Sequence, residues 1–116
     1  MGIPFKTKYA ESKDASLHWN RYVDRTLALQ IRDNDGLLGT ATVAVTGGKA
    51  HILAAGLTTE TAIIVKDYSE NEGMLACLIK NDIVEPPVAE VQTGFVKVHV
   101  CKLGKAGLAD LAIPRN

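Results

Sequence analysis

Short segments of alternating apolar residues constrain the fold of this chain more than any other feature. Leu27, Leu29 and Ile31 alternate with smaller or polar residues, and the same period of two returns over residues 41–45 and 96–100. Successive side chains of a β-strand point to opposite faces, so a period of two indicates strands with one buried face. Turn signals rich in Asn, Asp and Gly separate these segments, as at residues 33–36 and 47–48. The chain is therefore expected to be mainly β.

Further strands are expected over residues 50–55, 61–67, 74–80 and 88–103, and a short helix is the alternative for residues 74–80. In the last segment the two faces should carry Val96, Val98 and Val100 toward the core, and Lys97, His99 and Cys101 on the other side. Gly94 predicts a bulge or a bend there. About six or seven such strands are typical of an antiparallel β-sandwich or barrel. We expect that fold, with an irregular N-terminal arm and at most one or two short helices.

The 116 residues are enough for one domain, which divides into three parts. Residues 1–25 are expected to form the N-terminal arm, residues 26–103 the β domain, and residues 104–116 a C-terminal tail. Pro4 and many polar side chains make the first part irregular. Asp14 or Ser16 can cap a short helix that ends near residue 25, and a short strand is the competing interpretation.

Four of the six aromatic residues lie in the first 22 positions, namely Phe5, Tyr9, Trp19 and Tyr22. Aromatic side chains carry much of the binding energy of protein interfaces. Trp19 and Tyr22 either close the end of the domain's own barrel or contact a neighbour. Residues 3–14 have too little apolar content to form a core element. We therefore expect residues 1–14 to pack on another subunit, with the four aromatic residues as its interface.

The charge composition excludes some classes of partner. Thirteen basic and thirteen acidic residues balance to zero, whereas a nucleic-acid binder normally has a basic excess. The apolar runs are too short to span a membrane, and no signal peptide is visible, so a cytoplasmic protein is expected. Residues 60–90 carry seven acidic and two basic residues, and residues 91–116 carry four basic and one acidic. This asymmetry predicts complementary surfaces on neighbouring subunits.

Few residues indicate chemistry. His99 and Cys101 are two apart on an expected strand, so they share a face and form half of a metal site or a nucleophile–base pair. The sequence supplies no further ligand cluster and no orienting third group, so no catalytic, cofactor-binding or metal-binding residues are predicted. Cys77 and Cys101 are interpreted as buried free thiols in a reducing compartment, with a disulfide as the alternative.

Two stretches of the later half carry a resemblance to a known family. They are Gly73-Met74-Leu75-Ala76-Cys77-Leu78-Ile79-Lys80-Asn81-Asp82-Ile83 and Ala89-Glu90-Val91-Gln92-Thr93-Gly94-Phe95-Val96-Lys97-Val98. Together they resemble the later part of the small head-decoration, or capsid cement, proteins of tailed bacteriophages, in which an apolar strand runs through an Asp-Ile or Asp-Val turn into the next strand. The likeness lies within about residues 73–103 and involves no catalytic motif. The aromatic residues of the N-terminal arm lie outside that pattern.

The resemblance implies a non-enzymatic structural protein of the virion that binds and stabilises an assembled capsid. Such a protein would associate with itself and with a major capsid protein, need no cofactor, and enter the virion in the host cytoplasm. A phage tail or connector subunit fits the same features. Two other classes stay open, a small β-barrel module that binds a ligand or peptide, and an enzyme that uses His99 and Cys101.

Overall fold

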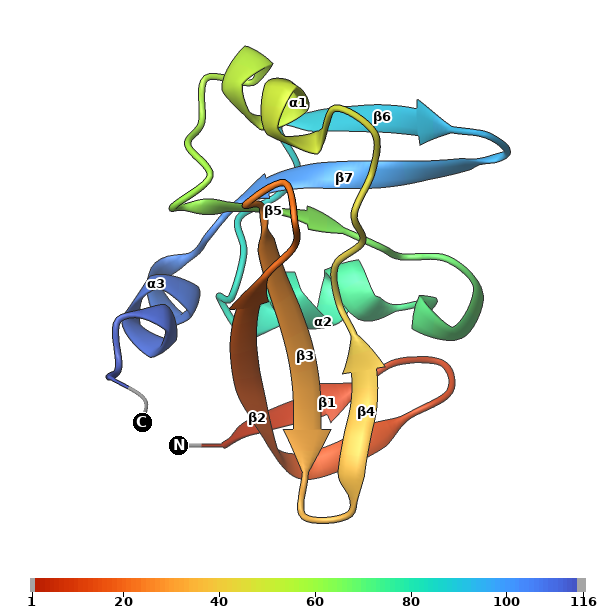
Figure 1. The fold of residues 1–116 in the computed structure, drawn as a ribbon. Helices are drawn as coiled ribbons and strands as arrows, with labels where there is room; N and C mark the ends of the chain where they lie inside the picture. The colour runs from red at the N-terminus through yellow and green to blue at the C-terminus, as the bar shows by residue number, and fades with distance from the viewer. Residues whose placement is uncertain (1, 115–116) are drawn as a thin grey trace.

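The computed structural model describes residues 2–114 and is mainly β, as the alternation predicted (Figure 1). The strands are β1 (Ile3–Lys6), β2 (Glu11–Arg21), β3 (Leu27–Asp33), β4 (Gly36–Thr40), β5 (Ala62–Val65), β6 (Ala89–Thr93) and β7 (Val96–Lys102). The helices are α1 (Gly48–Ala54), α2 (Met74–Lys80) and α3 (Lys105–Leu111), with a 3-10 turn, η1, at Ser69–Asn71. The strands form two antiparallel sheets that pack as a sandwich rather than a closed barrel.

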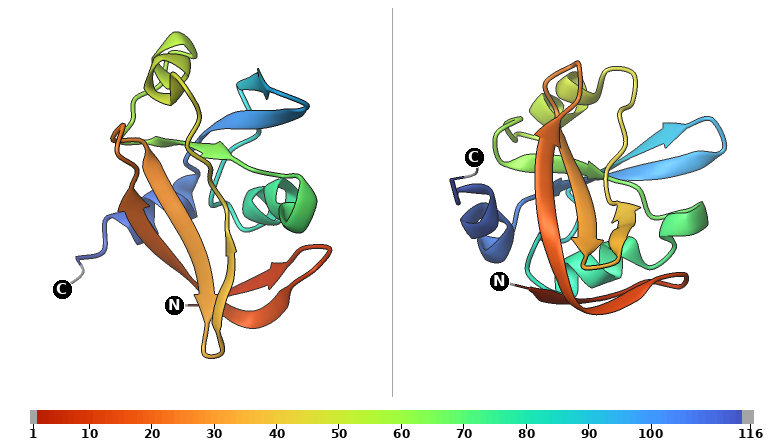
Figure 2. Two further views of the ribbon diagram at one scale, coloured as in Figure 1. Left: turned by 45° about the vertical axis from the view of Figure 1, so that its right-hand side comes forward. Right: turned by 60° about the horizontal axis from the view of Figure 1, so that its bottom comes forward.

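The first sheet has the order β1-β2-β3-β4, and each strand pairs with its neighbour in the chain. Leu17 of β2 lies opposite Ile31 of β3, and both face the core, whereas His18 lies opposite Gln30 on the outer face. The period of two therefore sorts apolar side chains inward and polar ones outward. Figure 2 shows the long β2 and β3 strands side by side.

The second sheet has the order β5-β7-β6 and forms the middle layer of the molecule. Ile63 and Cys101 face the first sheet and helix α2, within one buried cluster. Ile64 and Val100 face the opposite way and pack with Ile52 of α1 in a second cluster. Both faces of β5 are covered, so all four of its residues are buried. This explains its continuous apolar sequence.

Residues 41–43 join the two sheets. After β4, the Ala41 N–H donates to the Leu29 carbonyl at 2.8 Å, and the Lys66 N–H donates to the Ala41 carbonyl at 2.9 Å. The Val43 N–H donates to the Ile64 carbonyl at 3.2 Å, beside a bridge between Thr42 and Val65. The chain therefore leaves the first sheet already paired with β5 of the second.

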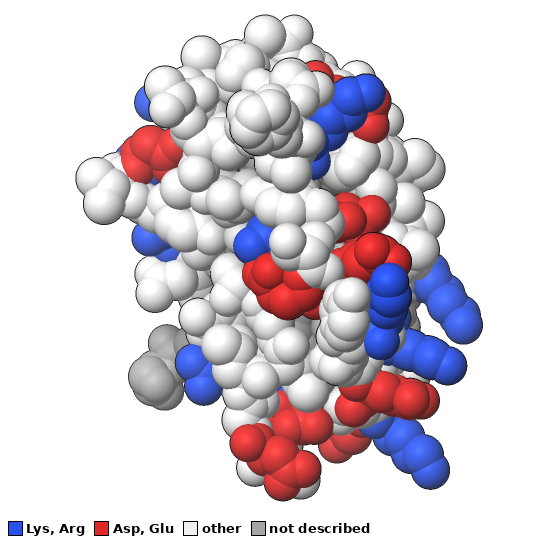
Figure 3. Space-filling view, turned by 90° about the vertical axis from the view of Figure 1, so that its right-hand side faces the viewer, with Lys and Arg blue, Asp and Glu red and all other residues white. Residues whose placement is uncertain are grey.

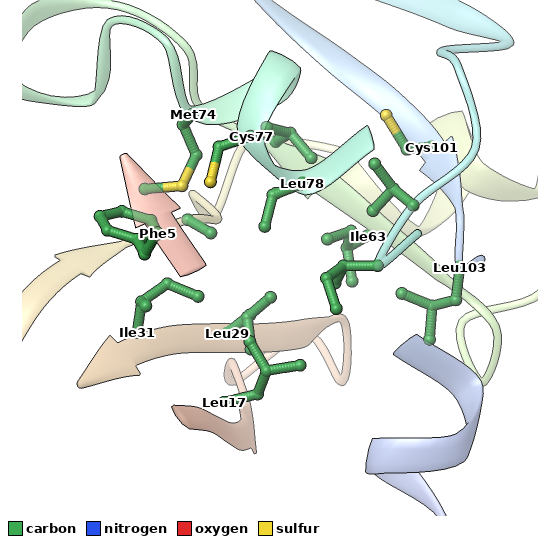
Figure 4. Close-up of a cluster of buried hydrophobic side chains, with 14 of the residues drawn as sticks. Phe5, Leu17, Leu29, Ile31, Ile63, Met74, Cys77, Leu78, Cys101 and Leu103 are labelled. Atoms are coloured by element: carbon green, nitrogen blue, oxygen red, sulfur yellow. The ribbon is translucent and has the colours of Figure 1, made fainter. Parts of the chain in front are cut away.

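The larger core lies between the first sheet, the second sheet and α2 (Figure 4). Phe5 of β1 lies close to Ile31 of β3 and Met74 of α2, and all three side chains are at most 1% exposed. Leu78, one turn of α2 further on, packs in the same cluster. A buried Phe contributes about 1.5–3 kcal/mol relative to an exposed one, so β1 is anchored to this core.

Helix α3 packs against the turn at residues 82–84. The Gly104 N–H donates to the Ile83 carbonyl at 2.8 Å, and the Ala106 N–H donates to the Asp82 carbonyl at 3.0 Å. A Cβ atom at residue 107 would collide with the Ile83 carbonyl oxygen, so glycine is required for this close approach.

The structure corrects several expectations about the chain ends. Residues 3–6 form β1 and residues 11–21 form β2, so the irregular N-terminal arm is wrong where the structure describes it. Phe5 is 1% exposed within its own domain, so its side chain belongs to the core of this chain. Of the two structures expected after residue 14, the strand is confirmed and the short helix is wrong. A strand that buries one face needs apolar residues only at alternate positions. The many polar residues of this segment therefore do not prevent it from forming a strand. Residues 1 and 115–116 lie outside the described part.

The helices are also more numerous than expected, with three α-helices between residues 2 and 114. Residues 50–55, expected as a strand, lie mostly in α1, and residues 74–80 adopt the helical alternative as α2. The tail at residues 104–116 contains α3. Short apolar runs are compatible with either a buried strand or a buried helix, which is why periodicity did not separate them. For Gly94 the bend alternative is confirmed, because this residue lies in the tight turn between β6 and β7.

Candidate binding site

The outer face of β2 and β3 carries a hollow with a volume of about 510 Å³, which we call the β2–β3 hollow. Antiparallel pairing builds it, because Asn20 lies opposite Ala28 and His18 lies opposite Gln30. Ala28 is small, and the longer side chains around it form the walls. The lining residues are His18, Trp19, Asn20, Arg21, Tyr22, Ala28, Gln30, Arg32 and Thr40.

Hydrogen bonds hold the side chains at one end of the hollow. The Tyr22 hydroxyl lies 3.0 Å from Thr42 Oγ1, which also accepts a hydrogen bond from the Leu29 N–H at 3.0 Å. Thr42 is 3% exposed, so the tyrosine ring is tied to a buried group next to the sheet junction. This end of the hollow is therefore formed before any partner binds.

Trp19 borders the hollow through its place in β2, but it lies opposite Leu29, so its side chain is on the inner face of the strand. Its indole N–H donates to the Asp110 carboxylate of α3 at 2.8 Å, and its ring packs against the larger core. The ring therefore fixes β2 to the core and to α3 from behind the hollow. Helix α3 supports the strand that carries the hollow, although it contributes no side chain to the lining.

The two arginines of the hollow differ in how they are held. Arg21 forms an ion pair with Glu60 at 2.8 Å and donates to the Thr59 carbonyl at 3.2 Å. Arg32 donates to the amide oxygen of Gln30 at 2.9 Å and makes no ion pair among the residues described. Both arginines are exposed, but only Arg21 is paired with a carboxylate, so Arg32 is the cation of the hollow that can best meet an incoming acidic or carbonyl group.

A second, smaller hollow of about 340 Å³ adjoins the first and shares His18 and Arg32 with it. Asp14, Ser16 and Asp33 also line it, and Ser16 Oγ lies 2.9 Å from His18 Nε2. The outer face of β2 and β3 is therefore a continuous polar surface with one aromatic end.

The four aromatic residues expected to form one interface do not lie together. Trp19 and Tyr22 line the β2–β3 hollow, Phe5 is in the core, and Tyr9 is 64% exposed in the turn between β1 and β2. Tyr9 precedes β2 and Tyr22 follows it, so the length of that strand separates them. Sequence reasoning missed Gln30 and Arg32, because their part in the site depends on the pairing of β2 with β3. The alternation along β3 was visible, but its partner strand was not identified.

His99 and Cys101 do not form the site considered from the sequence. Cys101 is 0% exposed, and burial raises the pKa of its thiol to about 12, so the nucleophilic thiolate is disfavoured near neutral pH. His99 Nδ1 lies 3.2 Å from Glu90 Oε2 without hydrogen-bond geometry. Within residues 2–114, no group of three or more His, Cys, Asp or Glu side chains could hold a metal ion. Cys77 and Cys101 are both buried free thiols, as predicted.

The acidic residues of positions 60–90 are partly paired within the molecule. Glu72 lies 3.2 Å from Lys8 of the β1–β2 turn, and Glu60 pairs with Arg21 of β2. Figure 3 shows basic and acidic side chains intermingled over one face instead of separated by sign. The complementary surfaces inferred from the charge blocks stay a prediction, because much of the asymmetry along the sequence is evened out in space.

No protein-family model, curated protein or solved structure matches this chain. In the described part, no helix is long and apolar enough to cross a membrane. The resemblance to capsid cement proteins, and the partners that it implies, stay predictions.

Proposed function

We propose that this protein is a structural protein that attaches to the surface of a larger protein assembly through the β2–β3 hollow. The observation that carries the proposal is that Tyr22, His18, Gln30 and Arg32 gather around one hollow on the outer face. Tyr and Arg are among the residue types enriched in the energetic centres of protein interfaces. Tyr22 is already held by Thr42, and Arg32 by Gln30, so little side-chain entropy is lost on binding.

The chemistry of the lining favours a protein surface over a small ligand. Ligand pockets are lined mainly by apolar side chains, with a few polar groups to orient the ligand. Here His18, Asn20, Gln30 and Arg32 place polar groups along most of the hollow. These groups suit the carbonyl, amide and carboxylate groups of a partner's loop, with its apolar part against the Tyr22 ring.

The assembly that we propose is the outer face of a phage capsid, as the resemblance over about residues 73–103 suggests. Those residues form α2 and the β6–β7 hairpin. Helix α2 packs in the core on the inner side of the first sheet, so the hollow on the outer side is left free for the capsid. A peptide-binding module is the alternative that uses the same hollow.

The test places a photo-cross-linking amino acid at Gln30 in phage-infected cells, with the same substitution at Lys102 as the control. Lys102 is exposed on β7 and lies outside the hollow. We expect adducts with a major capsid protein from residue 30 and none from residue 102. Equal labelling from both positions would contradict binding through the hollow. Specific adducts with a protein that is not part of the virion would contradict the capsid assignment and favour the peptide-binding alternative.

A second measurement compares Arg32→Ala with Lys102→Ala, each removing one exposed cation from a strand. Loss of an interface arginine that lies at an energetic centre costs about 2 kcal/mol or more, which weakens binding more than tenfold. We expect that loss of affinity for purified capsids with Arg32→Ala only. Equal affinity of the two variants would contradict the role of the hollow.

A further inference from the structure

We propose that the free edge of β6 pairs with β6 of a second copy of this chain, antiparallel, with Val91 opposite Val91 of the partner subunit. This surface is separate from the β2–β3 hollow, so the inference goes beyond the proposed function. It would create a symmetric dimer in which the two three-stranded sheets become one sheet.

The first observation is that β6 has an open edge. Among the described residues, β6 pairs with β7 on one side and with no strand on the other. Thr93 lies opposite Val96 across a hydrogen-bonded turn at Gly94 and Phe95. Residues in an antiparallel ladder alternate in the direction of their backbone groups. The alternation therefore turns the N–H and C=O groups of Glu90 and Gln92 toward the open edge.

The second observation is that exposed apolar side chains lie at both ends of this edge. Phe95 is 105% exposed at the hairpin tip, and Val88 is 55% exposed just before β6 begins. Both flank a strand of only five residues. Figure 1 shows the hairpin projecting beyond the rest of the domain. Pairing along this edge would bring both side chains to a contact with the second copy and remove them from water.

Symmetry and charge select one register. A two-fold axis perpendicular to the sheet keeps each side chain on its own face, so only residues on the same face can oppose each other. The axis can therefore pass beside Glu90, Val91 or Gln92. Glu90 on the axis would place two carboxylates opposite each other, which is unfavourable. Gln92 on the axis would leave Glu90 opposite the turn glycine.

A two-fold axis at Val91 pairs the outward backbone groups of β6 and also brings the exposed apolar side chains into the contact. It places Glu90 opposite Gln92 of the partner subunit, so the outward backbone groups of both residues are paired in both copies. It places Val88 opposite Gly94 of the partner subunit, beside that subunit's Phe95. Val91 is half-buried on the same face as Val98, so the two valines extend the smaller core across the axis. One register thus covers both exposed ends.

The same geometry limits growth beyond two copies. An isologous contact uses the same edge of both subunits and closes on itself. Pro86 and Pro87 precede Val88, and proline has no N–H to donate, so the pairing ends there. A dimer, and not a fibre, is the expected product.

A register-specific disulfide tests the proposal. Residues that face each other in a pair without hydrogen bonds have Cα atoms about 4.5 Å apart, within the range of a disulfide. Under mild oxidation, we expect Val91→Cys to form a disulfide-linked dimer, and Glu90→Cys or Gln92→Cys alone to form little. A mixture of the latter two variants should form the heterodimer. Faster cross-linking of Glu90→Cys or Gln92→Cys alone would overturn the register.

Sedimentation across a concentration series tests the dimer itself in the unmodified chain. We expect a mass that approaches twice the monomer, and at least a tenfold weaker association for Val88→Ser and for Phe95→Ser. Leu53→Ser is the matched control, because Leu53 is 53% exposed on α1, away from the edge. A monomer at every concentration, or equal weakening by Leu53→Ser, would overturn the proposal. Capsid binding by a monomeric chain would leave the proposed function standing, so the two can fail separately.

Discussion

The chain's two phenylalanines lie in opposite surroundings. Phe5 belongs to a strand whose neighbours in sequence are mostly polar, yet it is 1% exposed and packs with Ile31 and Met74. Phe95 comes directly before three alternating valines, yet it is 105% exposed at the tip of a hairpin. Burial in a β protein depends on which face a residue occupies and on what covers that face, more than on the composition around it.

The difference between the two regions comes from their partners. Strand β1 is held by β2 on its edge and by α2 across its inner face, so a single large side chain there fills core volume. The hairpin of β6 and β7 is covered by α1 near Val98 and Val100, but the turn extends past that cover. The base of the hairpin therefore belongs to the core, and its tip does not.

Deleting residues 2–14 is the most severe test of this comparison. The deletion removes β1, the start of β2 and the Phe5 side chain, so it exposes one side of the larger core. We expect the shortened chain to lose cooperative thermal unfolding by circular dichroism. A shortened chain with a native-like transition would show that the N-terminal strands are dispensable, contrary to their packing.

The base of the hairpin can be separated from its surface by two neighbouring substitutions. Val98 is 0% exposed, so Val98→Asp would bury a carboxylate without a partner and should cost more than about 4 kcal/mol. Lys97 is exposed, and Lys97→Glu should change stability by less than about 0.5 kcal/mol. Urea unfolding measures both. Similar losses from the two variants would contradict the assigned faces of β7.

The two phenylalanines can be compared directly by truncation. Phe5→Ala should lower the free energy of unfolding by about 3–5 kcal/mol, because it leaves a cavity in the core. Phe95→Ala should change it by less than about 0.5 kcal/mol when measured at low protein concentration, where the monomer predominates. Urea unfolding again gives both values. A larger loss at Phe95 would reverse the comparison.

Cys101 should have no effect on pH dependence near neutral pH, but it should make stability depend on pH in the alkaline range. Its folded pKa of about 12 lies above the reference value of 9.0, because burial disfavours the thiolate. Below pH 9 the thiol is protonated in the folded and in the unfolded chain, so the full stabilising contribution of Cys101 is present. Between pH 9 and 12 the unfolded chain loses the proton first, so stability should fall by up to about 1.4 kcal/mol per pH unit. Unfolding of the wild type and of Cys101→Ala across this range would isolate the effect. Parallel pH profiles would contradict it.

The fold was predictable where the pattern of apolar residues along the sequence is compatible with only one type of secondary structure. Leu27, Leu29 and Ile31 alternate strictly, and Ile63 to Val65 form a continuous apolar run, and all lie in strands. Residues 48–54 and 74–80 were less predictable, because a short apolar run such as residues 52–54 or 74–79 can be buried as a helix or as a strand. Strand β1 was missed, and β2 was predicted only as the alternative to a helix, because most of the residues on their outer faces are polar.

The candidate site was predictable only in part, for a similar reason. Trp19 and Tyr22 stood out as aromatic residues, and both line the hollow. Gln30 and Arg32 join them only because β3 pairs with β2 in one register, with His18 opposite Gln30. Register is a property of two segments together, so it cannot be read from either one alone.

The short segment at residues 41–43 has a consequence for how the molecule opens. Its backbone groups bond to Leu29 of one sheet and to Ile64 and Lys66 of the other. Neither sheet can separate without breaking these bonds, so the two should exchange their amide hydrogens as one cooperative unit. The slowest-exchanging amides should include those of Ala41 and Lys66, at the seam. The amides of the β6 edge should exchange much faster, unless a second copy protects them.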